Sequence, residues 1–299
     1  MQQAAPPIRV DSGAASKPGD ATYRHAAAFL FVAACGLQFA GSAAAIAGGL
    51  ALFLAGLPHG AFAGDGQLLI GRRSYALRYA ALGLAAALAF LLLPVTMLAV
   101  FLALSSWHFL REPDAGTWLR RTGVAGLAIG GSALLRPSQT QAVFAQLCGT
   151  AVPSGLMLAL GVAGAVGYAA TLLALVRKQG DVTLCAMAAG PALFHPVLAT
   201  GLVFMLGHAG PVTARLLRQH PKPRYVVVAT ATLSALLAGT AVYALSLSTA
   251  LLPYLAALPV AIILPHLLPH RWLVPARLTA RGVRAPRPQP RPRPDWPLG

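Results

Sequence analysis

Histidine is the residue type whose placement in this chain most strongly indicates chemistry. Four of the eight histidines lie at or near the end of an apolar segment: His59, His108, His208 and His266. Ionisable side chains are costly inside a bilayer, and those that occur there mark functional sites by default. Neutral imidazole is a good ligand for iron, copper, zinc and nickel. These four histidines are therefore candidate metal ligands.

The other histidines have ordinary explanations. His25 and His220 lie in polar loops, and His270 lies between Pro269 and Arg271-Trp272, which is typical of a membrane-interface anchor. On one straight helix His195 would lie about 20 Å from His208 and on a different face. His195 is therefore expected to serve in a turn or at the interface rather than in a shared centre.

Carboxylates near the candidate ligands are few. Asp65 follows His59, and Glu112 and Asp114 follow His108. These acids could accept hydrogen bonds from imidazole N–H groups, or they could be solvated loop residues. No Ser-His-Asp arrangement, phosphate loop or carboxylate pair is evident, so no catalytic residue is predicted beyond the metal ligands. Four imidazoles without a carboxylate suit Fe(II) that keeps open positions for O₂.

The composition is that of a polytopic membrane protein. The chain is 57% hydrophobic and 10% charged, with a mean hydropathy of +0.67. Seven acidic residues could not solvate a globule of 299 residues, whereas a bilayer removes that need. The net charge of +16 lies in short loops and one tail, without interleaved aromatic residues. This placement indicates contact with anionic lipid rather than with nucleic acid.

Apolar runs predict an all-α bundle of about nine or ten membrane segments within residues 25–272. The runs lie at about 26–41, 43–62, 76–93, 95–110, 118–135, 155–176, 181–209, 225–247 and 252–270. The first run could instead be the core of a cleaved signal peptide. Residues 1–24 and the Arg/Pro-rich tail 273–299 are predicted to be disordered and cytoplasmic.

Loop charge decides how often the long run 181–209 crosses the membrane. It carries breaks at Gly190-Pro191 and His195-Pro196. If it crosses twice, every basic cluster falls on the cytoplasmic side, as Lys and Arg in short loops favour. That count gives ten crossings with both termini inside. Because 181–194 is short for a span, it could also be a half-helix buried among others.

Ten crossings place the four candidate ligands at one depth. The helices carrying them then all run from outside to inside, and each histidine lies about 12–16 residues into its span. With a rise of about 1.5 Å per residue, all four lie roughly 18–24 Å from the outer end. The sequence therefore predicts that they can meet in the cytoplasmic half of the membrane.

The segments around these histidines resemble those of one known family. Pro58-His59-Gly60-Ala61, Ser106-Trp107-His108-Phe109, the segment 196–208 ending in Gly207-His208, and Leu264-Pro265-His266 come in the order of the Brp/Blh membrane β-carotene 15,15'-dioxygenases. The Pro-His-Gly-Ala element is the most specific of them. The resemblance covers about residues 40–272 and leaves out both tails.

The resemblance implies an integral membrane, iron-dependent enzyme. Such an enzyme splits the central double bond of β-carotene with O₂ and gives two molecules of retinal. His59, His108 and His208 match family histidines that are held to be iron ligands, and His266 is added here because its predicted depth agrees. The expected location is the bacterial inner membrane, crossed many times, with the lipid bilayer, a carotenoid and O₂ as partners.

Two positions depart from the family pattern. The family usually has Asp four positions after the first histidine, where this chain has Ala63. It also tends to carry a second histidine four residues after the third, where this chain has Val212. Either His266 completes the set, or the site has three histidines, or catalysis is lost.

Other functions are also compatible with the sequence. A relative that binds a carotenoid or retinal without cleaving it would explain Ala63 and Val212. A haem-b carrier would need paired histidines at two depths rather than four at one. A transporter would account for the broken run near Gly190-Pro191.

Overall fold

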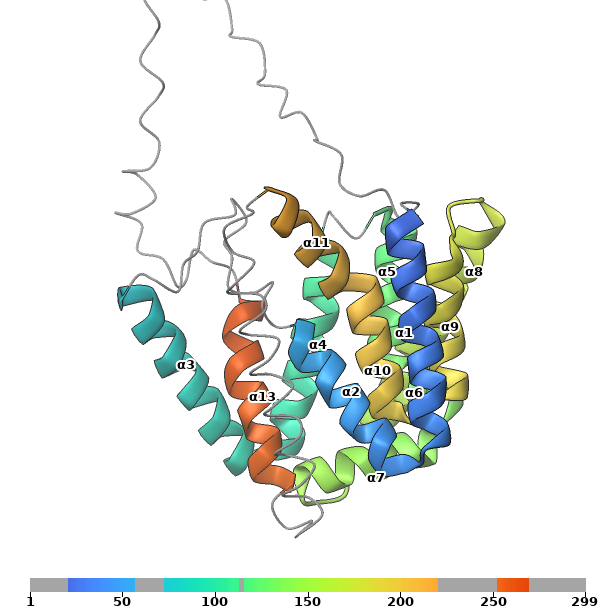
Figure 1. Ribbon diagram of the computed structural model, residues 1–299. Helices are drawn as coiled ribbons and strands as arrows, with labels where there is room; N and C mark the ends of the chain where they lie inside the picture. Colours follow the sequence, from blue (N-terminus) through green and yellow to red (C-terminus); the bar gives the residue numbers. More distant parts are fainter. Residues whose placement is uncertain (1–20, 57–72, 113–115, 220–251, 269–299) are drawn as a thin grey trace, which may run out of the picture.

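The computed structural model describes residues 21–56, 73–112, 116–219 and 252–268, and every regular element in these ranges is a helix (Figure 1). The elements are α1 (Ala21–Phe39), α2 (Ser42–Gly56), α3 (Arg73–Leu92), α4 (Pro94–Arg111), α5 (Trp118–Gly126), η3 (Leu127–Gly131), α6 (Ser132–Leu135), α7 (Pro137–Cys148), α8 (Ser154–Val176), α9 (Val182–Leu193), α10 (Pro196–Phe204), η4 (Met205–Ala209), α11 (Gly210–Gln219) and α13 (Leu252–Leu267). The predicted all-α fold class is confirmed.

The run 181–209 is divided into two helices, as its prolines predicted. Asp181 caps the start of α9 by accepting a hydrogen bond from the Leu184 N–H at 2.9 Å. The helix ends at Leu193, Phe194 is extended, and Pro196 opens α10 in the first helical turn, where its missing N–H costs nothing. Pro191 is accommodated inside α9.

Contacts with neighbouring helices show that the chain reverses at this break. At the upper end of the bundle in Figure 1, Arg120 at the start of α5 pairs with Asp181 at the start of α9. At the lower end, Arg136, which follows α6, donates to the Ala192 carbonyl near the end of α9. Helix α9 therefore runs downward beside α5, η3 and α6.

Helix α10 runs upward, antiparallel to α1. The His195 N–H donates to the Gln38 side chain at the lower end of α1, and the Tyr23 hydroxyl near its upper end donates to the Leu206 carbonyl. Helices α4 and α13 also run upward (Figure 1). Helices α2, α4, α10 and α13, which lead to the four candidate ligands, therefore all run upward, in agreement with the predicted parity.

Glycines let the backbones of neighbouring helices touch. A Cβ at Gly49 of α2 would lie 2.4 Å from the Val197 carbonyl oxygen of α10. On α8, a Cβ at Gly167 would lie 2.6 Å from the carbonyl carbon of Gly126 on α5. Small residues at such contacts are typical of helix association in lipid, where van der Waals packing replaces the hydrophobic effect between helices.

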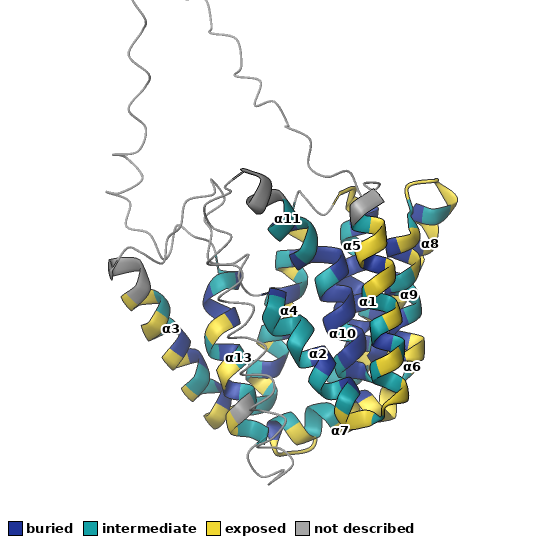
Figure 2. Cartoon of the chain, viewed as in Figure 1, coloured by how far each residue is buried: buried dark blue, intermediate teal, exposed yellow. Residues whose placement is uncertain are grey.

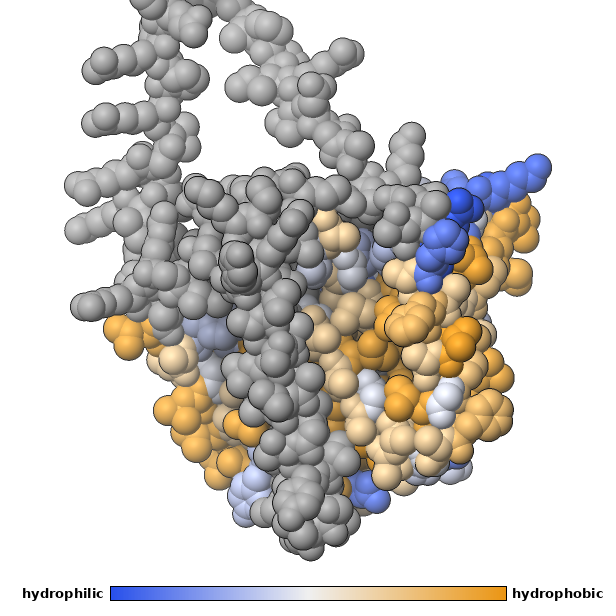
Figure 3. Space-filling model, in the orientation of Figure 1, coloured by the Kyte–Doolittle hydropathy of each residue, from blue (hydrophilic) through white to orange (hydrophobic). Residues whose placement is uncertain are grey.

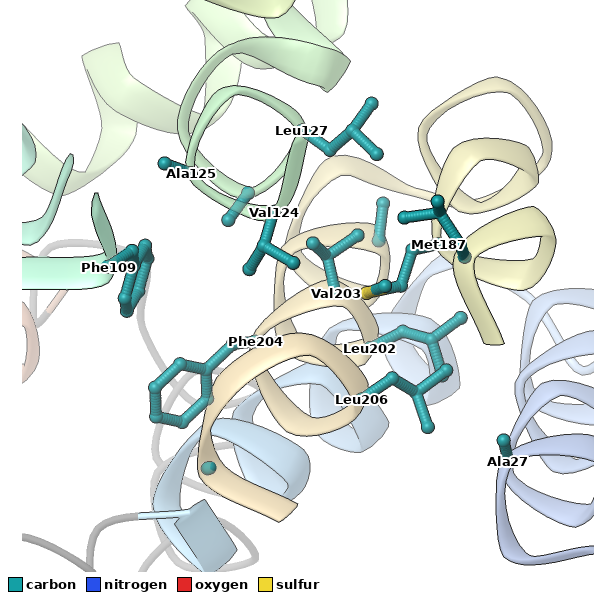
Figure 4. Packing of buried hydrophobic residues seen from close by; sticks show 14 of the residues in the cluster. Ala27, Phe109, Val124, Ala125, Leu127, Met187, Leu202, Val203, Phe204 and Leu206 are labelled. Atoms are coloured by element: carbon teal, nitrogen blue, oxygen red, sulfur yellow. The ribbon is translucent and has the colours of Figure 1, made fainter. Parts of the chain in front are cut away.

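The core is divided into two apolar clusters, and α4 contributes to both. The first cluster surrounds α10, which is the most continuously buried helix in Figure 2. In Figure 4, Leu202, Val203 and Leu206 of this region lie beside Met187 of α9. The second cluster joins α3, α4, α7, α8 and α13. Phe109 belongs to the first cluster and Leu102 to the second, so the upper part of α4 lies between them.

Within the described residues, three helical stretches are long and apolar enough to cross a membrane: Pro94–Arg111, Ser154–Val176 and Pro196–Ala214. Shorter apolar helices include α2, α9 and α13. Large apolar side chains are exposed on the outer faces, and Figure 3 shows hydrophobic surface along the side of the bundle with hydrophilic residues at its upper end. This distribution is that of a membrane protein.

Four sequence expectations differ from the described helices or fall outside them. Helix α1 begins at Ala21, inside the segment 1–24 that was expected to be unstructured. The connection 137–153 contains α7, which Pro137 opens and Gly149 ends in the left-handed conformation (φ 66°). Because its sequence is only weakly apolar, α7 had not been predicted. The predicted crossing 225–247 and the tail 273–299 lie outside the described residues.

Candidate metal centre

Three of the four candidate histidines meet near the upper end of the bundle. The Nε2 atoms of His108, in the last turn of α4, and His208, in η4, are 3.2 Å apart. The His266 ring, in the last turn of α13, lies with its centroid 4.9 Å from that of His108. His208 is 1% exposed, and the other two are half-buried. Histidines 58 to 158 residues apart in sequence thus form one imidazole cluster.

Glu112 joins this cluster from the end of α4. It lies one helical turn after His108, so both side chains project from the same side of the helix. Ligand atoms of His108, Glu112 and His208 all lie within 4.8 Å of one another. From the sequence, Glu112 could accept a hydrogen bond from an imidazole N–H group or be a solvated loop acid. Because the half-buried Glu112 lies within reach of two imidazoles, we favour a role in the site.

Two aromatic rings lie against His208. Phe109 and Phe204 lie with their ring centroids 4.8 Å and 5.8 Å from that of His208. Both phenylalanines are labelled in Figure 4, where they lie on the same side of the apolar core. An apolar wall of this kind limits access of water to the imidazoles, and it lowers the local dielectric constant.

A local widening of the helix carries His208. Residues Met205–Ala209 form a π-turn, in which the Gly210 N–H donates to the Met205 carbonyl instead of to that of Leu206. Such turns are rare in proteins, and those that occur are often found at functional sites. Gly207 in the same turn packs against Val124 and Met187, where a Cβ would come within 3 Å of both side chains. The sequence pattern did not predict this turn.

His59 lies outside the described residues. The helix that precedes it, α2, ends at Gly56, and a Cβ there would lie 2.3 Å from the Phe204 ring and 2.8 Å from the Ala209 Cβ. Gly56 is three positions before His59 in the sequence. It contacts Phe204, which precedes the π-turn of His208, and Ala209, the last residue of that turn. The described part of the chain thus leads toward the cluster at this point.

His195 does not belong to the cluster. It caps the lower end of α10, where its Nδ1 accepts a hydrogen bond from the Val197 N–H at 3.4 Å. Burial lowers the pKa of its imidazole, and the positive charge of Arg136 lowers it further. The turn role that was expected for His195 agrees with this position. His220 and His270 lie outside the described residues.

One of the two departures from the family pattern can be located. Val212 lies in α11, one helical turn beyond His208, and is 5% exposed. An apolar side chain therefore fills a buried position next to the candidate ligands. Ala63 and Asp65 lie outside the described residues.

A comparison with protein families shows to which family the chain belongs. The family model for beta-carotene 15,15'-dioxygenase matches residues 50–276, which include all four candidate histidines. A search of curated proteins found no match, and neither did a search of solved structures. The family match covers most of the chain and spans the helices that bring His108, His208 and His266 together. The chain belongs to the beta-carotene 15,15'-dioxygenase family.

Proposed function

We propose that this protein is a membrane non-haem iron dioxygenase that cleaves the central 15,15' double bond of β-carotene or a related carotenoid. Each carbon of that bond gains one oxygen atom of O₂, so one β-carotene gives two molecules of retinal. The observation that carries the proposal is the contact of His108 with His208 and His266 inside a chain that matches the dioxygenase family. We place the enzyme in the bacterial inner membrane, which its helices cross many times.

The side chains present fit a metal ion with nitrogen ligands. Two nitrogens bound at about 2.1 Å to one ion and separated by roughly 90–110° lie about 3.0–3.4 Å apart. The 3.2 Å between the Nε2 atoms of His108 and His208 falls in this interval. We assign the metal to His108, His208, His266 and His59, with the Glu112 carboxylate beside them.

The protein's own groups would bind the metal and shape an apolar site. Fe(II) held there would supply the activation of O₂ next to the polyene. The imidazoles must be neutral to bind metal. Phe109 and Phe204 exclude water and offer an apolar surface that suits a hydrocarbon chain. A carotenoid dissolved in lipid could reach such a site laterally, without a polar channel.

The test is retinal formation in cells that make β-carotene. Expression of the chain with iron and oxygen should remove the orange colour and yield retinal, measured by chromatography of the lipid extract. The His208→Ala variant should leave the colour unchanged, whereas His195→Ala, which changes a histidine outside the cluster, should still give retinal. Persistent colour with the wild-type chain would contradict the cleavage reaction.

A binding protein without cleavage activity is the second candidate. The burial of Val212 next to His208 favours it, because the family's second histidine is missing from a position close to the cluster. In that case the purified protein would carry intact carotenoid. The variants Val212→His and Ala63→Asp, singly and together, would then test the two departures. Retinal formed by either variant would locate the lost activity, and iron without retinal would point to another substrate.

A further inference from the structure

The π-turn that carries His208 leaves one backbone carbonyl without a helical partner. In an α-helix the Leu206 carbonyl would accept from the Gly210 N–H, but here that N–H donates to Met205. In a π-turn the Leu206 carbonyl would accept from the N–H of residue 211, but residue 211 is proline and has no N–H to donate. A carbonyl left in this way within a packed helix requires a donor from elsewhere.

Tyr23 supplies that donor from another helix. Its hydroxyl, on the first turn of α1, donates to the Leu206 carbonyl. The Tyr23 ring also lies close to Gly210, where a Cβ would be 3.8 Å from the ring and 2.7 Å from the Met205 carbonyl oxygen. Glycine at residue 210 thus leaves room for the π-turn, and the Tyr23 ring packs beside this glycine.

We propose that Tyr23 is a positioning residue for the metal centre: its hydroxyl holds the widened turn that presents His208 to His108. The inference rests on the proposed function, because it concerns the ligand geometry of that site. Tyr23 lies outside the residues 50–276 that match the family, so the match assigns it no role. It acts through the backbone of the turn and does not touch the imidazoles' ligand atoms.

The chain offers a matched control for removal of this hydroxyl. Tyr168 on α8 donates its hydroxyl to the Ala188 carbonyl of α9 at 2.8 Å. Both tyrosines are half-buried and both join two helices through a backbone carbonyl. Only Tyr23 bonds to the π-turn, so Tyr23→Phe and Tyr168→Phe make the same chemical change at different distances from His208.

The experiment uses the full chain in detergent with two readouts. Amide hydrogen exchange of residues 205–210 should be several-fold faster in Tyr23→Phe than in wild type. The dissociation constant of Co(II), titrated through its visible absorption as a stand-in for Fe(II), should rise roughly 3–10-fold, which corresponds to one hydrogen bond. Tyr168→Phe should leave both values at the wild-type level.

Two outcomes would overturn the proposal. One is unchanged exchange at residues 205–210, and the other is faster exchange with wild-type Co(II) affinity, which would make Tyr23 a purely structural residue. If wild type binds no metal, the proposed function fails, and the turn is tested by the rate at which diethyl pyrocarbonate modifies His208. A rate raised by Tyr23→Phe and not by Tyr168→Phe would support positioning, and equal rates in the two variants would refute it.

Discussion

At the scale of single residues, three imidazoles lie together in an otherwise apolar part of the bundle. His108 and His208 face each other through Nε2, and His266 lies against His108. None of the three would be expected in an apolar helix for packing alone, because a buried imidazole loses hydration. The free-energy cost of burying the imidazoles is offset if one metal ion binds all of them, because the binding free energy then stabilises the folded state.

We predict that replacing His59, His108 or His208 by Ala removes most of the bound iron, measured by metal analysis of the purified protein. The reason is the loss of one nitrogen from a site that has few other ligands. His195→Ala should keep the iron, because His195 caps the lower end of α10. Full iron content in a His59→Ala, His208→Ala double variant would place the metal elsewhere.

The role of His266 needs its own measurement. If His266→Ala keeps full iron, the protein site has three histidines, and Glu112 becomes the group to replace next. A carboxylate oxygen of Glu112 lies within 4.8 Å of a ring nitrogen of His108 and of His208. Loss of iron in Glu112→Gln would then identify it as a ligand or as the group that orients one.

At the scale of helices, close backbone contact through glycine fixes the spacing of the bundle. Gly126 and Gly130 on α5 and η3 face Gly167 and Gly164 on α8, so these two segments touch along several turns. A side chain at such a contact has no room, and the neighbouring backbone cannot rotate away as a side chain could.

We predict that Gly167→Ala destabilises the protein by about 1–3 kcal/mol, because the added Cβ would lie 2.6 Å from the Gly126 carbonyl carbon. Unfolding in mixed detergent, followed by circular dichroism, would measure the change. Gly161→Ala on the same helix is the control, since nothing lies within 4 Å of its Cβ. Helix propensity alone favours Ala over Gly, so Gly161→Ala should not lose stability. A loss of the same size in both variants would show that the contact with Gly126 is not responsible.

A buried ion pair joins the upper ends of α5 and α9. Arg120 and Asp181 are 3.1 Å apart, with side chains 5% and 15% exposed. We predict that Asp181→Asn destabilises the protein by roughly 3 kcal/mol, because it leaves Arg120 charged and unpaired. Asn is also a good N-cap, so the cap of α9 is kept and the effect reports on the charge. Arg177→Gln, which removes an exposed charge at the same end, should change the stability little.

At the scale of the whole molecule, the antiparallel arrangement of α9 and α10 decides which loops share a side. The upper end of the bundle carries Arg120, Arg121, Arg177 and Lys178, and the lower end carries α7 and a single arginine of the described residues, Arg136. Basic loops favour the cytoplasm, so we assign the upper end, and with it the histidine cluster, to that side.

We predict ten crossings with both termini inside. Reporter fusions should place residues 145 and 250 outside, and residues 75, 115, 178 and 220 inside. The decisive comparison is between residues 178 and 220, which flank α9 and α10. Reporters on opposite sides at these two positions would contradict the double crossing. They would also contradict the prediction that the four histidines lie on one side of the membrane.

The sequence by itself determined the class of the protein and the direction of its helices. Composition requires a bilayer, because so few charged residues cannot solvate a globule. Pro191 and Pro196 predicted the break between α9 and α10, since proline disfavours helix at the residue before it. Parity then placed His108, His208 and His266 on helices of one direction, and the order of their motifs indicated the family.

Only the tertiary structure decided which faces of these helices meet. Depth along a helix follows from residue counts, but rotation about its axis depends on packing, which glycine contacts such as Gly49 with Val197 determine. The π-turn at Met205–Ala209 changes the face that His208 presents, and no periodicity predicts an added residue in a turn. Glu112 lies near His208, and Tyr23 reaches the π-turn, for the same reason: segments distant in sequence contact each other only after the chain has folded.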